Sequence, residues 1–387
     1  MRPETIAIRT QTERTGEKEH STPLFLTSSF VYDSAEDMAD AFAIEDLDVN
    51  IYTRFSNPTV DEFIKKVCLL EGAEDGIATG TGMAAVFSAF MTFLSSGDHI
   101  ISASAVFGST HTILTKYLPK WGIEYSYFNM NQPETIEALI KPNTKMLYVE
   151  TPSNPGLDII DLQLVADICK KHNILFVVDN CFATPAVQRP MELGADLVLH
   201  SATKFMDGQG RVLGGVVVGN KALVKQMYLF VRNTGPSMSP FNAWVISKSL
   251  ETLFVRMDKH AENALKIAQS LEGHPAISWV KYPFLPSHPQ HDIAKKQMKN
   301  GGGVLTFELK AGIEGGRKFL NNLKWLSMTN NLGDSRTIAS HPASTTHSKL
   351  SEEERAAVGI SPGLIRLSVG LEHPDDILEE ILQALGA

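Results

Sequence analysis

One lysine directly follows a predicted buried strand and has hydroxyl side chains just before it. Lys204 lies in HSATKFMDGQGR (200–211), after Ser201 and Thr203. An amine that can lose its proton in a desolvated site can form an imine with a carbonyl compound. The neighbouring hydroxyl groups could donate hydrogen bonds to a phosphate. A solvated lysine in a surface loop is the alternative interpretation.

A carboxylate ends the preceding predicted strand. Asp179 follows the apolar run ILFVV (174–178). A carboxylate at the edge of a buried sheet needs a partner, because an unpaired buried charge is costly. The pyridinium nitrogen of pyridoxal phosphate (PLP) requires such a carboxylate, which keeps the ring protonated. A helix N-cap or a turn would also suit an aspartate here.

A glycine-rich segment could hold the phosphate of such a cofactor. ATGTGMAAV (78–86) is expected to lead from a strand into a helix, so that the backbone N–H groups near Gly82 and Met83 point at an anion. The segment also fits the dinucleotide pattern G-x-G-x-x-A. That pattern requires an acidic residue at the end of the next strand, and none stands there. A nicotinamide-dependent oxidoreductase therefore remains only a remote alternative.

Two arginines are further candidates for binding anions. Arg54 stands near Tyr52 in IYTRFSNPT, and it could hold a phosphate through charge-assisted hydrogen bonds. A surface turn is the alternative. Arg366 lies in the apolar strand IRLSVGL. It is either an edge residue whose charged end reaches solvent or a buried clamp for a substrate carboxylate.

The elements that must position these residues alternate between apolar strands and helices. This pattern predicts an α/β fold with a mostly parallel sheet covered on both faces. Ligands of such sheets bind beyond the carboxyl ends of the strands, where Asp179 and Lys204 fall. The expected strands are 99–103, 123–128, 145–150, 174–179, 195–200 and 214–219, with helices at 60–70 and about 82–95.

The chain of 387 residues is too long for one typical core. Residues 1–50 show few regular signals and are expected to form an N-terminal arm. Residues 51–250 are expected to form the cofactor-binding domain. After a long helical region at 242–272, strand-like segments at 302–309 and 365–371 predict a smaller α+β domain over 251–387.

Charge and composition exclude several classes of protein. The net charge is −9 and no long basic run occurs, so neither a nucleic acid nor an anionic membrane is an expected partner. Three cysteines without a CxxC pair suggest neither a zinc site nor a disulfide framework, and no metal is expected. Without a signal peptide or an apolar stretch of membrane-spanning length, we expect a cytoplasmic protein.

Ordered motifs along nearly the whole chain resemble the Cys/Met-metabolism family of fold type I PLP enzymes. This family includes cystathionine γ-synthase, the cystathionine and methionine γ-lyases and the homoserine sulfhydrylases. The greatest similarity is to the O-succinylhomoserine sulfhydrylases. The resemblance implies a PLP cofactor and a seven-stranded, mostly parallel sheet. The motifs are YTRFSNPT, TGTGMAAV, VFGST, ETPSNP, VVDNCFATP, HSATKFMDGQGR, PSHPQH, NLGD, SHPASTTH and IRLSVGLE.

The resemblance also implies roles for the residues around the cofactor. Lys204 would form the Schiff base and carry protons, and Asp179 would pair with the pyridinium nitrogen. Asn154 would lie near the ring hydroxyl. The groups expected to bind the phosphate are Gly82, Met83, Ser201 and Thr203.

Other implied roles concern the substrate and a neighbouring subunit. Arg366 would grip the α-carboxylate of an amino-acid substrate. Tyr52 and Arg54 would reach the phosphate in a neighbouring subunit, in a homotetramer built from two dimers. Tyr52 and Phe107 join Lys204 as expected catalytic residues.

Three positions depart from the common pattern of the family. Phe107 stands where most relatives have a tyrosine stacked on the cofactor ring, so the phenol is lost. Ser109 replaces the cysteine that methionine γ-lyases carry. Asn331 stands where relatives often have a serine. Its backbone could still bind the carboxylate, and the role of its side chain is open.

The missing phenol suggests a reaction. A phenol can protonate a poor leaving group, whereas an ester expels a carboxylate that needs no proton. Phe107 therefore favours γ-replacement on O-succinyl- or O-acetylhomoserine, with sulfide giving homocysteine for methionine biosynthesis. Cystathionine γ-synthase and a γ-lyase acting on cystathionine or methionine are the alternatives. A succinyl group would want a cation, which Arg336 or Arg211 could supply, although each arginine more often is a solvated loop residue.

Overall fold

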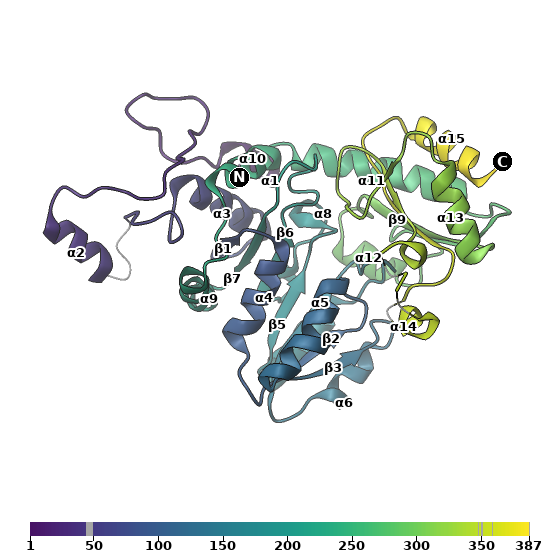
Figure 1. The fold of residues 1–387 in the computed structure, drawn as a ribbon, viewed down its shortest axis with the longest axis horizontal. Coiled ribbons are helices and arrows are strands. Elements are labelled where there is room, and N and C mark those ends of the chain that lie inside the picture. Colours follow the sequence, from purple (N-terminus) through teal and green to yellow (C-terminus); the bar gives the residue numbers. More distant parts are fainter. Residues whose placement is uncertain (44–48, 347, 350, 358, 387) are drawn as a thin grey trace.

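A seven-stranded sheet forms the centre of the computed structural model (Figure 1), which describes residues 1–43, 49–346, 348–349, 351–357 and 359–386. In spatial order the strands are β1 (Asp75–Thr79), β7 (Gly215–Gly219), β6 (Leu197–Ser201), β5 (Leu175–Asp179), β4 (Thr144–Glu150), β2 (His99–Ala103) and β3 (Glu124–Phe128). Only β7 runs antiparallel to its neighbours among these strands. The predicted mostly parallel sheet of seven strands is confirmed.

Helices bury this sheet, as the nearly continuous apolar strands require. Two of them pack together against it, namely α4 (Gly82–Phe93) and α9 (Lys221–Thr234). A further helix, α3 (Pro58–Glu71), packs on β1 and β7, and α10 (Pro240–Leu250) packs on α3. Strand β5 is followed after a short loop by α8 (Thr184–Val187) and preceded by α7 (Leu162–His172).

A second sheet with its own apolar core lies at the C-terminal end of the molecule. Its order is β10 (Ser327–Met328), β11 (Ile338–Ser340), β12 (Leu364–Ser368), β9 (Val304–Leu309) and β8 (Ile277–Lys281). The helices α13 (Gly312–Asn322) and α15 (Pro374–Leu385) pack together beside it. The smaller α+β unit predicted from the sequence therefore corresponds to a separate sheet.

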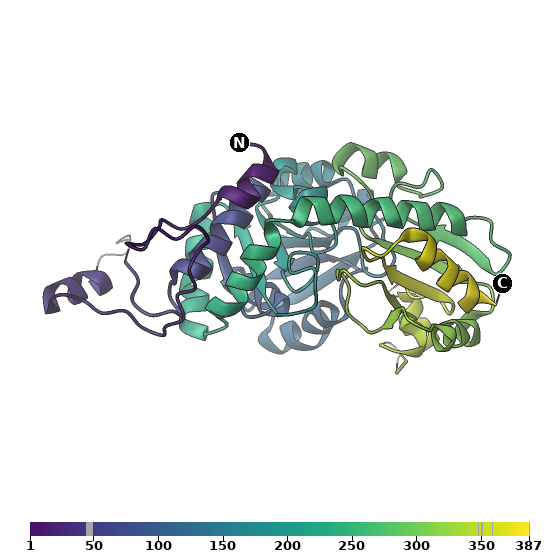
Figure 2. The same cartoon turned by 90° about the horizontal axis from the view of Figure 1, so that it is seen from above.

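The predicted long helical region at 242–272 is two helices, α10 and α11 (Leu253–Leu271). The break at 251–252 holds no Gly or Pro that would have marked it. The carbonyl of Ser249 instead accepts hydrogen bonds from the Thr252 hydroxyl (3.1 Å) and from Arg256 (3.0 Å), and these bonds satisfy the end of α10. Figure 2 shows α11 as the long green helix that runs from the first sheet toward the second.

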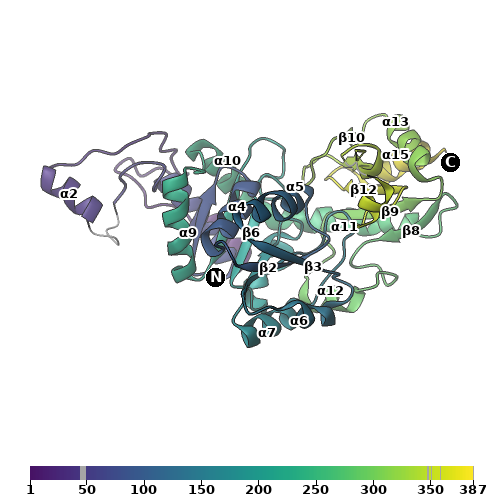
Figure 3. The ribbon, with the colours of Figure 1, turned by 60° about the horizontal axis from the view of Figure 1, so that its bottom comes forward.

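The N-terminal arm is partly helical. Its first helix, α1 (Pro3–Arg9), packs on α3, whereas α2 (Ala35–Ala43) lies apart from the rest of the molecule (Figure 3). Buried Glu62 of α3 fixes the base of the arm, because it accepts hydrogen bonds from Thr12 N (2.8 Å) and the Thr22 hydroxyl (2.7 Å). Beyond this point apolar side chains face solvent, with Leu26 70% and Val31 97% exposed.

No helix within the described part of the chain is both long and apolar enough to cross a membrane.

Candidate active site

A cavity of about 210 Å³ lies at the carboxyl ends of β4, β5 and β6, next to the first turn of α4. Loops after parallel strands and a helix N-terminus converge there, as the sequence predicts for a ligand site. Residues that the sequence singled out make up much of its lining, namely Gly82, Met83, Phe107, Asn154, Asp179, Ser201, Thr203, Lys204 and Arg366. The fold thus brings together groups that lie up to 284 residues apart between Gly82 and Arg366 (366 − 82).

Lys204 lies in the turn after β6, and its amine donates a 2.7 Å hydrogen bond to the side-chain carbonyl of Asn331. Burial lowers the pKa of Lys204, the nearby Arg366 guanidinium lowers it further, and the Asp179 carboxylate opposes these effects. A lowered pKa raises the fraction of the amine that is neutral and therefore nucleophilic. Asn331 itself does not line the cavity, and it contacts the site through Lys204 and Arg366.

The carboxylate of Asp179 is held by two donors. One oxygen accepts from the backbone N–H of Cys181 (3.0 Å), and the other accepts from the Tyr148 hydroxyl (3.1 Å). Asp179 is 8% exposed and lines the cavity, so its free lone pairs are available to a ligand. Burial raises the pKa of Tyr148 well above its ordinary value, so that its hydroxyl stays a donor. Tyr148 lies inside an apolar strand, where sequence patterns reveal packing and not partners.

The start of α4 provides an anion cradle. Thr81 is the N-cap, since its side chain accepts from Ala84 N, and the amides of Gly82 and Met83 have no acceptor within the helix. A Cβ at Gly82 would lie 2.5 Å from Cβ of Ser201, so only glycine permits this approach. Backbone donors and the Ser201 hydroxyl can therefore reach one anion from two sides.

Thr203 contributes to the same wall of the cavity. Its hydroxyl oxygen accepts from Gly214 N (3.1 Å) and donates to Gly214 O (3.3 Å). These bonds tie the Lys204 turn to the start of β7.

Arg366 is a buried group of β12, 7% exposed. The alternative of an edge residue is wrong, because β12 pairs with β11 on one side and β9 on the other. Its guanidinium donates to the Asn154 side-chain oxygen (2.9 Å) and to the Asn331 carbonyl (3.3 Å). Burial lowers the pKa of Arg366 to about 10, which leaves it cationic at neutral pH and able to clamp a carboxylate.

A buried acid that the sequence did not single out completes this wall. Glu150 ends β4 beside Asp179 of β5, and it accepts a 2.7 Å hydrogen bond from the backbone N–H of Phe107. Burial raises the pKa of Glu150 well above its ordinary value, and the Asp179 charge adds to this. Glu150 therefore fixes the position at which Phe107 begins α5 (Gly108–Thr112).

The structure does not bring Tyr52 and Arg54 to the Lys204 cavity. Both line a second cavity of about 530 Å³ together with Leu26 and the segment 237–240. The Arg54 guanidinium lies 4.8 Å from the ring centroid of Phe55 and donates to the carbonyl of Arg232. Within one chain, these two residues are therefore separate from the other predicted cofactor ligands.

The two arginines considered for a succinyl carboxylate have partners of their own. Arg211 forms an ion pair with buried Asp207 (2.8 Å), and Arg336 forms one with Asp334 (2.9 Å). Neither lines the Lys204 cavity. The structure therefore favours their interpretation as loop residues.

Comparison with known proteins identifies the family. The family model for Cys/Met metabolism PLP-dependent enzymes matches residues 4–386. The chain is 45% identical to O-succinylhomoserine sulfhydrylase of Pseudomonas aeruginosa over 384 residues, which cover 99% of this chain and 95% of the relative. It is also 45% identical to L-methionine gamma-lyase of Porphyromonas gingivalis over 368 residues, covering 94% and 92%.

A crystal structure gives the same result. A Campylobacter jejuni protein assigned as O-acetylhomoserine (thiol)-lyase, which contains N'-pyridoxyl-lysine-5'-monophosphate, superposes with a TM-score of 0.95 at 34% identity. The match covers 100% of both chains. With the geometry of the cavity, these similarities show that the chain belongs to the Cys/Met metabolism family of enzymes and uses pyridoxal phosphate as its cofactor.

Proposed function

We propose that this enzyme carries out γ-replacement on an O-acylated homoserine, with sulfide as the acceptor and homocysteine as the product. The observation that carries the proposal is Phe107, which lines the Lys204 cavity without a phenol. Sequence similarity alone does not separate the reactions, because a sulfhydrylase and a γ-lyase are equally identical to this chain. Our choice between them therefore rests on the chemistry available at position 107.

The cavity fits the cofactor at three places. The amides of Gly82 and Met83 suit its phosphate, the carboxylate of Asp179 suits its ring nitrogen, and the Lys204 amine suits its aldehyde. When bound, pyridoxal phosphate supplies an electron sink for the bonds that break at the substrate. Ser201 and Thr203 are the hydroxyl groups we assign to the phosphate, and Asn154 is assigned to the ring hydroxyl.

Lys204 is the group we assign to proton transfer. Its amine takes the proton from Cα of the substrate, gives that proton up, and as a free base again takes the proton from Cβ. Asn331 accepts a hydrogen bond from this amine at 2.7 Å and so holds it within the cavity. Arg366 binds the α-carboxylate and orients the Cα–H bond toward the lysine, which is a positioning effect of the kind that lowers barriers.

Phe107 provides a flat apolar surface for the cofactor ring. It offers no proton to the atom that departs from Cγ. A carboxylate, the leaving group of an ester, departs without protonation, whereas the thiolate of a thioether benefits from a general acid. The cavity therefore favours esters as substrates.

A second copy of the chain completes the site in this proposal. Tyr52 and Arg54 lie on a partly exposed surface next to the arm, outside the Lys204 cavity. We assign them to the phosphate in a neighbouring subunit, within a homotetramer built from two such dimers. The exposed apolar residues Leu26 and Val31 support an arm that is covered by a partner.

Product analysis tests the proposal. Purified enzyme loaded with cofactor is incubated with O-succinylhomoserine or O-acetylhomoserine and sulfide, and the products are quantified. We expect homocysteine to exceed 2-oxobutyrate, and kinetics with both esters will show which acyl group is preferred. Release of 2-oxobutyrate alone would contradict γ-replacement, and a preference for cysteine over sulfide would make the enzyme a cystathionine γ-synthase.

A further inference from the structure

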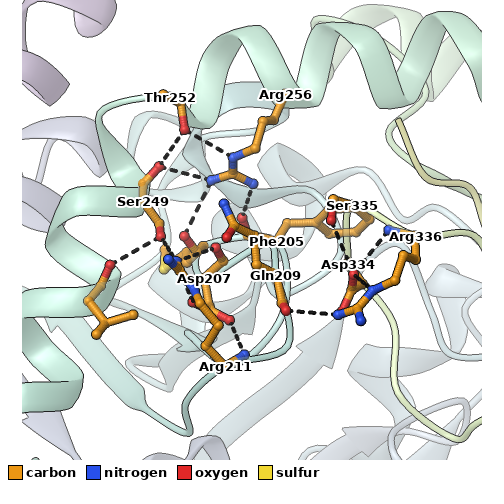
Figure 4. Close-up of polar contacts among 12 residues, drawn as sticks. Phe205, Asp207, Gln209, Arg211, Ser249, Thr252, Arg256, Asp334, Ser335 and Arg336 are labelled. Carbon is orange, nitrogen blue, oxygen red and sulfur yellow. Dashed lines mark hydrogen bonds and ion pairs between the residues drawn. The ribbon is translucent and has the colours of Figure 1, made fainter. Parts of the chain in front are cut away.

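Arg256 lies outside the cavity and donates a hydrogen bond to Phe205, the residue that follows Lys204 in its turn (Figure 4). We propose that Arg256 of α11 is a positioning residue, which sets the place of the Lys204 amine by fixing the two residues that follow it. The inference rests on the proposed role of Lys204 and adds a group of the C-terminal region to the machinery of the reaction.

Arg256 donates its hydrogen bonds to backbone carbonyls on both sides of it. It bonds to Phe205 O (2.7 Å) and more weakly to Met206 O (3.4 Å) on the turn. Its other partners are Ser249 O (3.0 Å) and the Thr252 hydroxyl (3.2 Å) on the chain that leads into α11. At 7% exposure this guanidinium has little access to water, so a shift of the turn would leave buried donors unpaired.

Close approach of the backbone confirms how tightly the turn is packed. Gly208 has a φ of +70°, and a Cβ there would lie 2.1 Å from Nη1 of Arg256. On the other side, a Cβ at Gly333 would lie 2.5 Å from the backbone nitrogen of Phe205. The Phe205 ring also packs edge-on against His260 of α11, at 5.1 Å between centroids. Arg256 and these contacts therefore restrict movement of the turn.

This support reaches the amine through the backbone of Lys204. The Lys204 carbonyl accepts from Gly208 N at 2.8 Å, and its N–H donates to Ser201 O at 3.2 Å. The lysine is therefore an integral part of the turn that Arg256 grips. Because Arg256 does not line the cavity, its loss should leave the carboxylate clamp at Arg366 in place.

The other charged groups in this region hold different parts of the turn. Asp207 accepts two bonds from the Arg211 side chain, and Arg336 donates to the carbonyl of Gln209 at 3.0 Å. Figure 4 shows Arg256 reaching the turn from α11, while Arg336 lies to the right of the turn and contacts it at Gln209. Among these arginines, Arg256 alone bonds to the residues directly after Lys204.

The test compares Arg256→Met and Arg256→Lys with Leu271→Ala, all loaded with cofactor. Leu271 is fully buried in the second core on the same helix, so its truncation destabilises α11 without touching the turn. For Arg256→Met we expect kcat to fall on the order of tenfold to hundredfold. KM for the acylhomoserine should change by less than about threefold. Arg256→Lys keeps the charge and loses the planar guanidinium fork, so its kcat should lie between those of Arg256→Met and the parent enzyme.

Two readouts do not depend on turnover. Visible circular dichroism reports the orientation of the bound cofactor, and hydrogen exchange reports the protection of residues 202–210. We expect both to change in the Arg256 variants and neither to change in Leu271→Ala. Because these readouts need no substrate, they stand even when the assigned substrate is wrong, so failure of the proposed reaction and failure of this inference are distinguishable.

Gly208→Ala provides an independent route to the same displacement. Its added Cβ should push the Arg256 guanidinium away and lower kcat, and this effect should shrink in the Arg256→Met background, since coupled sites are not additive. The inference is overturned when Arg256→Met keeps the kcat and dichroism of the parent enzyme. It is equally overturned when Leu271→Ala reproduces the kcat loss below its melting temperature.

Discussion

The Lys204 cavity and the Tyr52–Arg54 cavity differ in how much of their surroundings one chain supplies. In the first, Asp179, Glu150 and Arg366 are each less than 10% exposed and have hydrogen-bond partners from distant elements. In the second, Tyr52 is 40% exposed and adjoins an arm whose apolar side chains face solvent. One chain therefore builds a rigid site for the lysine, and it presents the other two residues outward.

This difference suggests a division of labour. In the proposed site, Lys204 and Arg366 must be placed accurately for proton transfer, and one chain supplies both, because a small misplacement is costly. Arg54 would only hold the phosphate, so a second subunit can supply it. Variants in each cavity should therefore differ in what they impair.

Replacing the amine should abolish the function of the first cavity. We expect Lys204→Ala to lower kcat by about 10³-fold or more, since no other described lysine lines the cavity and general acid–base catalysis is worth 10²–10⁴. Steady-state kinetics with acylhomoserine and sulfide measure this. The matched control is Lys221→Ala at the exposed start of α9. An equal loss in both variants would count against the assigned site.

Removing the cation of the second cavity should weaken cofactor binding and leave the groups that line the first cavity in place. We expect Arg54→Met to lower cofactor affinity on the order of tenfold to hundredfold, as the loss of hydrogen bonds to a charged group would. Hybrid oligomers of Arg54→Met with Lys204→Ala should regain roughly a quarter of parent activity, because one site in each mixed pair is intact.

The control for this experiment is a second hybrid. Lys204→Ala combined with Arg366→Ala should gain no activity over the two variants alone, because both residues serve the same cavity within one chain. Recovery in this control, or no recovery with Arg54→Met, would show that sites are not shared in the manner proposed.

A substitution at Arg366 separates substrate binding from proton transfer within the first cavity. Arg366→Lys loses the planar fork but keeps the charge. We expect KM for the acylhomoserine to rise about tenfold or more, with a smaller change in kcat, from the loss of a charge-assisted bond. A fall in kcat at constant KM would place Arg366 in proton transfer instead of binding.

The smallest expected effect concerns leaving-group preference. Phe107→Tyr should alter turnover of the ester by less than about tenfold, because the ring surface is kept. It should also gain cleavage of cystathionine or methionine, measured as 2-oxobutyrate, since a phenol becomes available. Thioether cleavage by the parent enzyme at the rate of the Tyr variant would contradict the assigned role of Phe107.

The sequence predicted the central sheet well because its strands are short, apolar and regularly spaced. Segments 99–103, 145–150 and 214–219 differ from β2, β4 and β7 by no more than one residue at either end. The break between α10 and α11 escaped prediction because side chains of Thr252 and Arg256 end the helix there without a helix-breaking residue.

Most of the cavity could also be anticipated, because its residues follow strands or begin a helix. The contacts between segments that lie far apart in the sequence could not be anticipated. Lys204 bonds to Asn331, and Arg256 bonds to Phe205, across sequence separations that no local pattern reports. Glu150 is the last residue of a predicted strand, and its bond to Phe107 depends on how two distant segments meet.

Reductive trapping of the cofactor tests directly whether Lys204 carries it. The loaded enzyme is treated with borohydride and digested, and the modified peptide is sequenced by mass spectrometry. We expect the reduced pyridoxyl group on Lys204, within the peptide that also contains Phe205. A label on any other lysine, or none in an enzyme that still turns over substrate, would contradict it.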